Sequence, residues 1–448
     1  TDEQRVVYDI VVSACLSDED CTFDIRGRAG TGKTILMNAI IAAQVRLNNR
    51  LTAPAASTGL ASLNQPFGLT FHRTWSIPVP DPRDDTVVQS NLDKSPRLQL
   101  MSAVRLATLD EAPSLHIASY EAASMKGKIQ LMAGDTRQIG AVVEFGGEAE
   151  TFQASIMSSH YYRDNVKVFR LTKTMRNMGD PAFSAMVDRV GDGLVAPDGD
   201  GLITIHGVRT ETDISASIDY IFPAEVLRDP TLCAKRAFIT SHNVTVDDIN
   251  DAVLSRVEGE VHILEGKSVL DHENLECDLD DAFCMSEHLC TVTQSGVPAD
   301  TLRLKVGIVV MLTRNLDISH GLCNSSKLVV LHITKYTLLV QNLKDGVEHF
   351  IPRITFGFIT KQGVAVKRVQ FPVRLCFAIT IYKSQGQTLD KVLFDNRTDV
   401  FMHGCLYVAL SRVRAAKDIR ILIEPSRVSV DGFARVLNVV YKSLLDNV

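Results

Sequence analysis

Short apolar runs that end in small or acidic residues alternate with helical segments through residues 22–175 of the chain. Five of these runs are predicted strands: TFDIRG (22–27), RLTAPAA (50–56), RLATLDE (105–111), KIQLMAGD (128–135) and KVFRLT (167–172). Apolar strands separated by helices are typical of a parallel sheet that is covered on both faces. The pattern therefore predicts an α/β fold.

The same pattern returns in the second half of the chain. The predicted strands there are AKRAFITSHN (234–243), RLCFAITIYKSQG (374–386), DKVLFDN (390–396) and DIRILIEP (418–425), and VALSRVRAA (408–416) has the pattern of a strand end turning into a helix. Between these runs, residues 300–370 contain strands joined by short turns, which indicates an antiparallel β module. The Gly/Asp-rich stretch GDGLVAPDGDG (191–201) is typical of a linker.

These patterns predict two α/β domains, the second of which is interrupted. We expect the first domain at residues 1–195, with a small surface excursion around 70–95. The second domain is expected at 203–280 and 370–448, with the β module inserted at 285–368.

The charge is unevenly distributed. The net charge is −6, but residues 258–287 carry ten acidic residues and one lysine, whereas residues 301–375 carry eleven Lys and Arg and three acidic residues. A basic segment within an acidic protein favours a nucleic-acid partner; the alternative is a solvated surface on which charges happen to cluster. No apolar run reaches the roughly 18 residues that a membrane span needs, so we expect no membrane partner.

Nine scattered cysteines, with no Cys-x-x-Cys pair, indicate a reducing compartment inside the cell. The chain starts with acidic residues, so we do not expect a signal peptide there. A zinc site is conceivable in one group, but its spacing matches no finger or ribbon, which favours a non-metal role. The group consists of His272, Cys277, Cys284, His288 and Cys290.

The segment GRAGTGKT (27–34) matches the phosphate-binding loop pattern G-x-x-x-x-G-K-[ST] in full, between a predicted strand and a predicted helix. Backbone N–H groups of such a loop surround phosphates, and the helix N-terminus adds positive potential. Lys33 is expected to reach the β- and γ-phosphates and Thr34 to ligate Mg²⁺. ATP and Mg²⁺ are therefore the predicted cofactors, held by Gly27, Gly30, Thr31, Gly32, Lys33 and Thr34.

Two further strand ends carry candidate chemistry. Asp110 follows an apolar strand and is placed to hold Mg²⁺, and Glu111 is placed to act as a general base on water. Gln138, after the next strand, is a candidate to sense the γ-phosphate or orient that water. The alternative for Asp110 and Glu111 is an ordinary pair of strand-end carboxylates, and the alternative for Gln138 is a surface turn.

Several segments together resemble the PIF-type DNA helicases of superfamily one, including related viral and transposon helicase domains. They run in order over nearly the whole chain: the phosphate-binding loop, LTAPAASTGLASL (51–63), TFHRTWSIP (70–78), DEAPS (110–114), GDTRQI (134–139), LTKTMRN (171–177), RNLDISHGLCN (314–324), YKSQGQTLD (382–390) and YVALSRV (407–413). The resemblance implies two RecA-like domains with ATP between them and a β-barrel-like insertion in the second. It also implies an ATP-dependent helicase, active in DNA repair or recombination, that moves 5′ to 3′ along single-stranded DNA.

The resemblance implies further roles at the ATP site. Gln4 matches an adenine-reading glutamine, Arg176 an arginine that approaches the γ-phosphate, and Arg412 the arginine finger of the last motif. Gly386 is also placed at the nucleotide. The alternatives are a polar helix-surface residue for Gln4 and structural salt bridges for the arginines. Arg414 matches no catalytic position and is expected to be a surface charge.

The resemblance also implies a set of contacts to single-stranded DNA and to single-strand/double-strand junctions. Trp75 and Phe71 are candidates to stack on bases, with core packing as the equal alternative. The remaining predicted contacts are Pro54, Thr58, Gly59, His72, Thr240, Asn243, Ser384, Gln385 and Gly386. We expect the isolated protein to be a monomer that unwinds duplexes, and family members also resolve quadruplexes or RNA–DNA hybrids.

The sequence also departs from the family pattern. The run GDTRQIGAVV lacks the usual Phe and prolines, Asn-Ser-Ser replaces Asn-Gly-Thr at 324–326, and the stretch between DEAPS and GDTRQI is short. Biology specific to the cellular members is therefore not implied. Two alternative functions stay open: a viral-type RNA helicase of the same superfamily, and a nucleic-acid-binding module that does not hydrolyse ATP.

Overall fold

The structure is a computed structural model that describes residues 1–17, 20–78, 88–123, 125, 127–143, 146–173, 179–271, 289, 292, 294, 296–360 and 363–446. The chain divides into two compact units. The first unit combines Thr1–Thr212 with Ile381–Val448, and the second is Asp213–Thr380. This division differs from the predicted domains, in which residues 370–448 belong with residues 203–280. The predicted domain boundaries stay a prediction.

A six-stranded sheet lies at the centre of the first unit, in the order β3-β2-β4-β5-β1-β6. All of its strand pairs are parallel, and the five strands expected from the sequence lie within two residues of the predicted bounds. The strands are β1 (Thr22–Gly27), β2 (Leu51–Ala56), β3 (Leu69–Thr70), β4 (Val104–Asp110), β5 (Ile129–Gly134) and β6 (Val166–Leu171).

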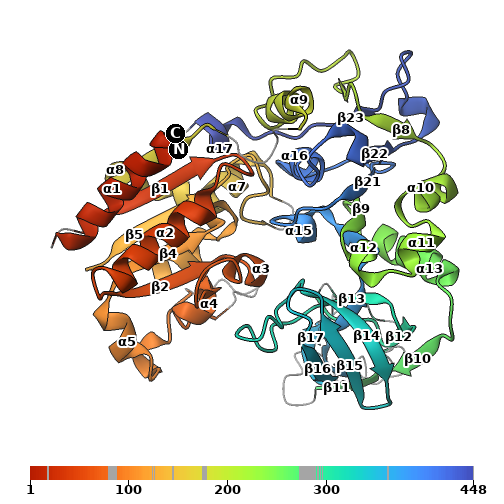
Figure 1. Cartoon of the computed structure of the whole chain (residues 1–448), viewed down its shortest axis with the longest axis horizontal. Coiled ribbons are helices and arrows are strands. Elements are labelled where there is room, and N and C mark those ends of the chain that lie inside the picture. The colour runs from red at the N-terminus through yellow and green to blue at the C-terminus, as the bar shows by residue number, and fades with distance from the viewer. Residues whose placement is uncertain are drawn as a thin grey trace. The chain divides into compact units, whose positions relative to one another are not determined.

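Helices cover both faces of this sheet (Figure 1). One core cluster joins α1 and α2 to the sheet through Val11, Ile40 and Leu131, and another on the far face includes Trp75, Leu109 and Met157. The helices of this part are α1 (Asp2–Leu16), α2 (Lys33–Arg46), α3 (Gly59–Ser62), α4 (Phe71–Thr74), α5 (Leu98–Ala103), α6 (Ile117–Ala122), α7 (Glu148–Ala154), α8 (His160–Asn165) and α9 (Pro181–Gly191).

The C-terminal part of the first unit adds a second set of parallel strands. β22 (Ile419–Leu422) pairs with β21 (Lys391–Asp395) and β8 (Arg209–Glu211). Two sequence expectations are wrong here: residues 381–384 and 405–410 form helices α15 (Ile381–Ser384) and α16 (Cys405–Leu410) rather than strand ends. The remaining elements are β7 (Ile203–Thr204), β23 (Arg435–Val436) and α17 (Lys442–Asp446).

The second unit contains a parallel strand pair and an antiparallel β module. β9 (Arg236–Thr240) pairs in parallel with β20 (Ala378–Thr380), next to α10 (Ile214–Ile221), α11 (Ala224–Leu227), α12 (Pro230–Ala234) and α13 (Asn243–Arg256). The module holds β10 (His262–Glu265), β11 (Lys267–Leu270), β12 (Thr301–Leu304), β13 (Val309–Leu312), β14 (Lys327–Ile333), β15 (Thr337–Asn342), β16 (Glu348–Pro352), β17 (Ile354–Ile359), β18 (Ala365–Gln370) and β19 (Val373–Leu375).

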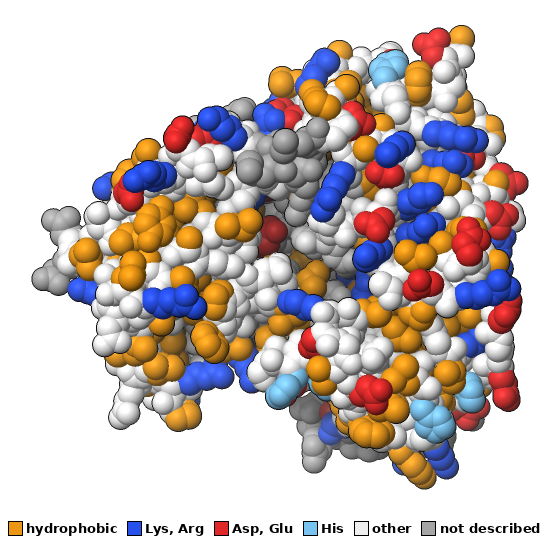
Figure 2. All heavy atoms as spheres, in the orientation of Figure 1, with side chains coloured by type: hydrophobic (Ala, Val, Ile, Leu, Met, Phe, Trp, Pro, Cys, Tyr) orange, Lys and Arg blue, Asp and Glu red, His pale blue; other side chains and the backbone are white. Residues whose placement is uncertain are grey.

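All strand pairs within the module are antiparallel. Together with the parallel strands elsewhere, they confirm the predicted fold class of parallel α/β sheets with an antiparallel β insertion. On the visible face, Lys and Arg side chains are interspersed with acidic ones (Figure 2). Among the helices that the structure describes, none is long and apolar enough to cross a membrane.

Candidate active site

The predicted catalytic segments of the first unit meet at one edge of its sheet. Strands β4, β5 and β1 are neighbours and parallel, so their carboxyl ends lie side by side. The phosphate-binding loop follows β1, Asp110 ends β4, and the segment that leads to Gln138 follows β5. Ligands of open α/β sheets bind outside the carboxyl ends of the strands, so this edge is the candidate active site.

The phosphate-binding loop has the backbone that its glycines allow. Gly30 and Gly32 have φ angles of 86° and 81°, a left-handed conformation that side chains disfavour. Gly32 is the N-cap of α2, so the free N–H groups of that helix face the loop. The ammonium of Lys33 donates to the carbonyl oxygens of Gly27 (2.6 Å) and Arg28 (3.0 Å). The lysine therefore lies over the loop that is predicted to hold the phosphates.

Thr34 and Asp110 lie in direct contact. The hydroxyl of Thr34 donates to Oδ2 of Asp110 at 2.8 Å, and Oδ1 of Asp110 accepts the N–H of Glu111 at 2.9 Å. Asp110 is buried, and burial raises the pKa of its carboxyl. A hydroxyl beside a carboxylate is a set of hard oxygen donors that fits Mg²⁺, so these two residues would hold that ion.

Glu111 has the features of a general base. Its φ of 54° is unusual for a residue with a side chain, and such strain gathers at functional sites. Burial and then the neighbouring Asp110 carboxylate raise the pKa of Glu111 to about 7, while Lys33 and Arg412 oppose this rise. A carboxyl with a pKa near neutral pH is suited to accept a proton from water.

Gln138 is buried beside Asp135, and its Oε1 has no hydrogen-bond partner within the part of the chain that the structure describes. Its Nε2 donates to Oδ2 of Asp135 at 3.5 Å. The same carboxylate oxygen accepts the hydroxyl of Tyr407, in α16, at 2.7 Å. A buried polar atom without a partner is rare and costly, so Oε1 of Gln138 is available to accept a hydrogen bond from a water molecule.

Arg412 is 1% exposed, and several backbone carbonyls accept hydrogen bonds from it. Its Nε donates to the carbonyl of Val408 at 2.8 Å, and Nη1 donates to the carbonyls of Ser384 (3.3 Å) and Gln387 (3.0 Å). Its charge lowers the pKa of Glu111, which places its guanidinium in electrostatic reach of the predicted base. Arg414, by contrast, is exposed, as expected for a surface charge.

Gln4 reaches the phosphate-binding loop from α1. Its Nε2 donates to the carbonyl of Thr31 at 3.0 Å, and a Cβ on Gly32 would lie 2.6 Å from that nitrogen. The side chain therefore lies against the loop rather than in solvent. Gly386, also predicted at the nucleotide, is exposed with a φ of 78°.

Four predicted DNA contacts lie after or within β2 and in α4. Thr58 is the N-cap of α3 and accepts the N–H of Ala61, and Gly59 begins that helix. Pro54 is buried within β2. His72 is half-buried, its Nε2 lies 3.1 Å from Oγ of Ser119, and burial lowers its pKa.

The stacking role predicted for Trp75 and Phe71 is not available to these side chains. Each is only 1% exposed, and both belong to the core cluster beneath β2 and β4. Their rings lie 6.3 Å apart at 45° to each other. The alternative of core packing is therefore correct, because an aromatic ring must expose a face to stack on a base.

The other predicted DNA contacts have mixed exposure. The hydroxyl of Ser384 is buried and donates to the carbonyl of Ile381, whereas Gln385 is partly exposed. In the second unit, Thr240 is buried and Asn243 is exposed, with its Oδ1 accepting from Arg374 at 3.2 Å. Arg176 lies outside the described residues, as do the five members of the His/Cys group: His272, Cys277, Cys284, His288 and Cys290.

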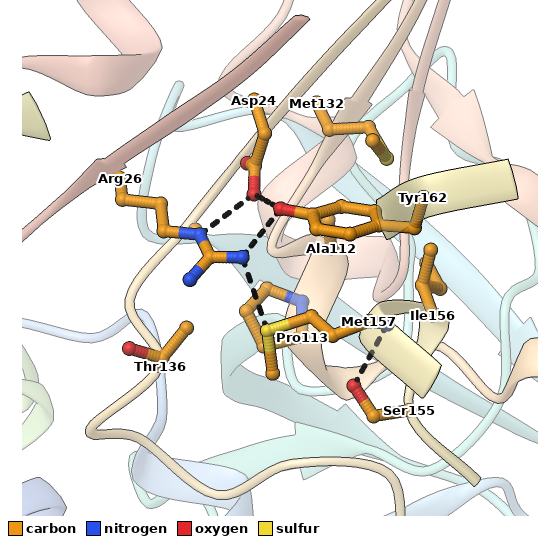
Figure 3. A pocket seen from close by; sticks show the side chains of 11 residues that line it. Asp24, Arg26, Ala112, Pro113, Met132, Thr136, Ser155, Ile156, Met157 and Tyr162 are labelled. Atoms are coloured by element: carbon orange, nitrogen blue, oxygen red, sulfur yellow. Dashed lines mark hydrogen bonds and ion pairs between the residues drawn. The ribbon is translucent and has the colours of Figure 1, made fainter. Parts of the chain in front are cut away.

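Sequence reasoning missed a buried polar network behind the active site (Figure 3). Nε of Arg26 donates to Asp24 at 2.8 Å, and both side chains contact the hydroxyl of Tyr162. The network lines a cavity of about 20 Å³ together with Pro113, which follows Glu111 closely. The alternation of charged residues within the TFDIRG strand was the available signal, since charges in a two-sided buried strand must pair.

Comparisons with known proteins agree with this architecture. A family model described as PIF1-like helicase matches residues 1–200, and one described as the 2B domain of DNA helicase Pif1 matches residues 287–333. The ATP-dependent DNA helicase PIF1 of Xenopus laevis is 27% identical over 429 residues, which is 92% of this chain. This chain spans only 60% of the length of that relative.

Solved structures show the same fold. The Bacteroides Pif1 helicase in complex with ADP-AlF3 and ssDNA matches with a TM-score of 0.64 and 22% identity, over 94% of this chain and 92% of that one. The Pif1 helicase of Candida albicans matches with a TM-score of 0.60 and 22% identity, over 94% of each chain. These likenesses cover both units of the fold.

Proposed function

The chain belongs to the PIF1-like helicase family, and from that premise we propose that it is an ATP-dependent DNA helicase. It moves 5′ to 3′ along single-stranded DNA and unwinds duplexes, and quadruplexes or RNA–DNA hybrids are further candidate substrates. One observation carries the proposal: the hydroxyl of Thr34, at the end of the phosphate-binding loop, donates to Asp110 at 2.8 Å, although the two motifs lie 76 positions apart in the sequence.

The residues present fit ATP and Mg²⁺. In the structure Lys33 donates to loop carbonyls, and a bound phosphate offers its ammonium a stronger, charged acceptor. Thr34 and Asp110 are the oxygen donors that would hold Mg²⁺, an ion that neutralises charge between the β- and γ-phosphates. The unpartnered Oε1 of Gln138 is free to accept a hydrogen bond from the attacking water.

Two residues are assigned to the chemical step of ATP hydrolysis, one to the proton of the attacking water and one to the charge on the γ-phosphate. Glu111 accepts the proton of the attacking water, because its raised pKa keeps it basic enough near neutral pH. Arg412 stabilises the charge that develops on the γ-phosphate, a role that suits a guanidinium that stays ionised. Movement along DNA then requires that ATP binds one conformation more tightly than another.

The ATPase assignment is tested by Lys33→Ala. Steady-state hydrolysis is measured with and without single-stranded DNA, and with RNA as a parallel activator. We expect turnover to fall by at least two orders of magnitude, while Lys94→Ala, at an exposed lysine of the same unit, keeps the wild-type rate. Wild-type turnover in Lys33→Ala would refute the site. Stimulation by RNA alone would favour the RNA helicase, and no hydrolysis with any nucleic acid would favour the binding module.

Polarity and partners need a second experiment. Two duplexes of equal sequence, one with a 5′ single-stranded tail and one with a 3′ tail, are offered at equal concentration. We expect unwinding only from the 5′ tail, and unwinding only from the 3′ tail would overturn the polarity. Sedimentation of the free protein tests the proposed monomer.

The proposed location is a reducing compartment inside the cell. Six cysteines are free in the part of the chain that the structure describes, which supports this proposal. Fractionation of host cells tests it, because recovery of the protein in an oxidising compartment would contradict it.

A further inference from the structure

Phe67 is an unusual surface residue. Its side chain is 97% exposed, which makes it the most exposed aromatic residue that the structure describes. It lies in the turn between α3 and β3, and its φ is 57°. A left-handed backbone is a true outlier for a bulky residue and costs about 1–2 kcal/mol.

Core packing does not explain this conformation. An exposed ring gains almost nothing from burial in the free protein, and Gly or Asn would adopt the same backbone at lower cost. Isolated exposed hydrophobic residues are common, but this one also has a strained backbone. Strained residues gather at ligand-contacting sites, where the gain comes from the ligand.

The turn that carries Phe67 is held in place from below. Gln65 is buried, its Nε2 donates to the carbonyl of Ala55 at 3.0 Å, and its Oε1 accepts the hydroxyl of Thr108 at 2.9 Å. Gly68 fits so tightly that a Cβ would lie 2.3 Å from the carbonyl oxygen of Ser62. The turn therefore has little room to change shape and presents the ring to solvent in a fixed direction.

The position of this turn connects it to the proposed DNA site. Thr58 and Gly59 precede it at the start of α3, and His72 follows it in α4. β2 and β3 are paired at Ala56 and Thr70. Because Phe67 is three residues before Thr70, the two lie within about 10 Å.

Phe67 is the alternative to Phe71 and Trp75, the two aromatic residues that the sequence suggested for stacking on bases. Residues 51–78 contain three aromatic side chains, and Phe71 and Trp75 are buried in the core. Phe67 is the one that has a free ring face. An exposed ring on a rigid turn, beside a segment that is proposed to contact the DNA backbone, has the arrangement that single-strand binding proteins use to stack bases.

We propose that Phe67 stacks on a nucleobase of the bound single strand, beside the strand segment that contacts Thr58 and His72. The inference rests on the proposed DNA-binding function. Stacking is insensitive to base identity, because every base has a π face. The contact therefore fixes the register of the strand on the first unit without adding sequence preference.

The test compares binding to a DNA strand that carries bases with binding to a strand that lacks them. Fluorescence anisotropy measures the affinity of wild type, Phe67→Ala and Phe67→Tyr for an oligothymidylate and for the same backbone with abasic positions. Phe67→Ala should bind the oligothymidylate about 5- to 150-fold more weakly than wild type. Its affinity for the abasic strand should be unchanged, and Phe67→Tyr should restore binding. Phe401→Ala, at another exposed phenylalanine of the same unit, is the matched control.

Each failure has a distinct result. Equal affinity of wild type and Phe67→Ala for the oligothymidylate overturns the stacking role while DNA binding stands. An equal loss on both strands also overturns it, because the ring would then act through the backbone or through folding. If the wild-type protein binds neither strand but still hydrolyses ATP, the DNA-binding function fails instead. A far-UV circular dichroism spectrum of Phe67→Ala equal to that of wild type shows that the variant is folded.

Discussion

The predicted role of Glu111 can be tested through its ionisation. Burial and the neighbouring Asp110 raise its pKa to about 7, whereas an ordinary glutamate has a value near 4.5. A general base acts only in its ionised form, so the rate constant kcat/KM should rise with pH through this value, since kcat/KM reports the free enzyme. At a pKa of about 7 the ionised fraction rises about tenfold between pH 6 and pH 8.

The assay is DNA-stimulated ATP hydrolysis at low ATP concentration from pH 5.5 to 9, at constant ionic strength. We expect a single rising limb with its midpoint near pH 7. Glu111→Gln should hydrolyse ATP about 100- to 10,000-fold more slowly, and its rate should no longer rise with pH through 7. Glu121→Gln, at an exposed glutamate of α6, should keep the wild-type rate and the wild-type pH dependence. A flat profile between pH 6 and pH 8 in the wild type would refute the reasoning.

The same pKa shift has a consequence for stability. A carboxyl whose pKa is raised on folding binds its proton more tightly in the folded state, so its ionisation destabilises the fold as pH rises. At pH 8 Glu111→Gln should therefore be more stable than wild type, by at most about 3 kcal/mol. The gain should disappear below pH 4.5, where both states are protonated. Urea denaturation at the two pH values measures the difference, and a Glu111→Gln variant that is less stable at pH 8 would contradict the assigned burial.

Three further substitutions test other contacts. Trp75→Ala should cost about 3–5 kcal/mol in urea denaturation, because the ring is buried; a loss below about 1 kcal/mol would restore the stacking role. Gly404→Ala should lower both stability and ATP turnover, because the φ of Gly404 is 74° and a Cβ would lie 2.3 Å from the carbonyl of Arg137; wild-type turnover would contradict this. Tyr407→Phe should lose about 1–3 kcal/mol of stability by removing the hydroxyl that donates to Asp135, and kcat should fall while the KM for ATP stays; a change in KM alone would argue against this coupling.

The sequence predicted the first sheet well because its strands are buried on both faces. The runs that end at Gly27 and Asp110 are shorter than an ordinary helix and are bounded by turn residues, and both features favour a strand. The phosphate-binding loop was equally clear, because its glycines are needed for a backbone that only they adopt readily. The parallel order of the strands then brought the loop, Asp110 and Gln138 to one edge, as the motif order implied.

The errors had two sources: a local pattern that fits two structures, and contacts between residues that are distant in the sequence. Residues 381–384 read as part of a strand, since a short apolar run does not distinguish strand from helix. The burial of Trp75 depends on a core assembled from several helices and strands, which no local pattern reveals. The bond between Tyr407 and Asp135 spans 272 positions, and sequence spacing cannot predict such a contact.

The candidate site also shows how the fold keeps charges ready for a ligand. The ammonium of Lys33 and the guanidinium of Arg412 both donate to backbone carbonyls, which are neutral acceptors. Hydrogen bonds to charged acceptors are roughly twice as strong as neutral ones, so under the proposed function a triphosphate would offer Lys33 a better acceptor than the carbonyls that it contacts. Glu111 carries a strained backbone and a raised pKa beside them. The strained backbone and the raised pKa of Glu111 cost stability in the free protein, which is the relation expected of a residue retained for catalysis rather than for folding.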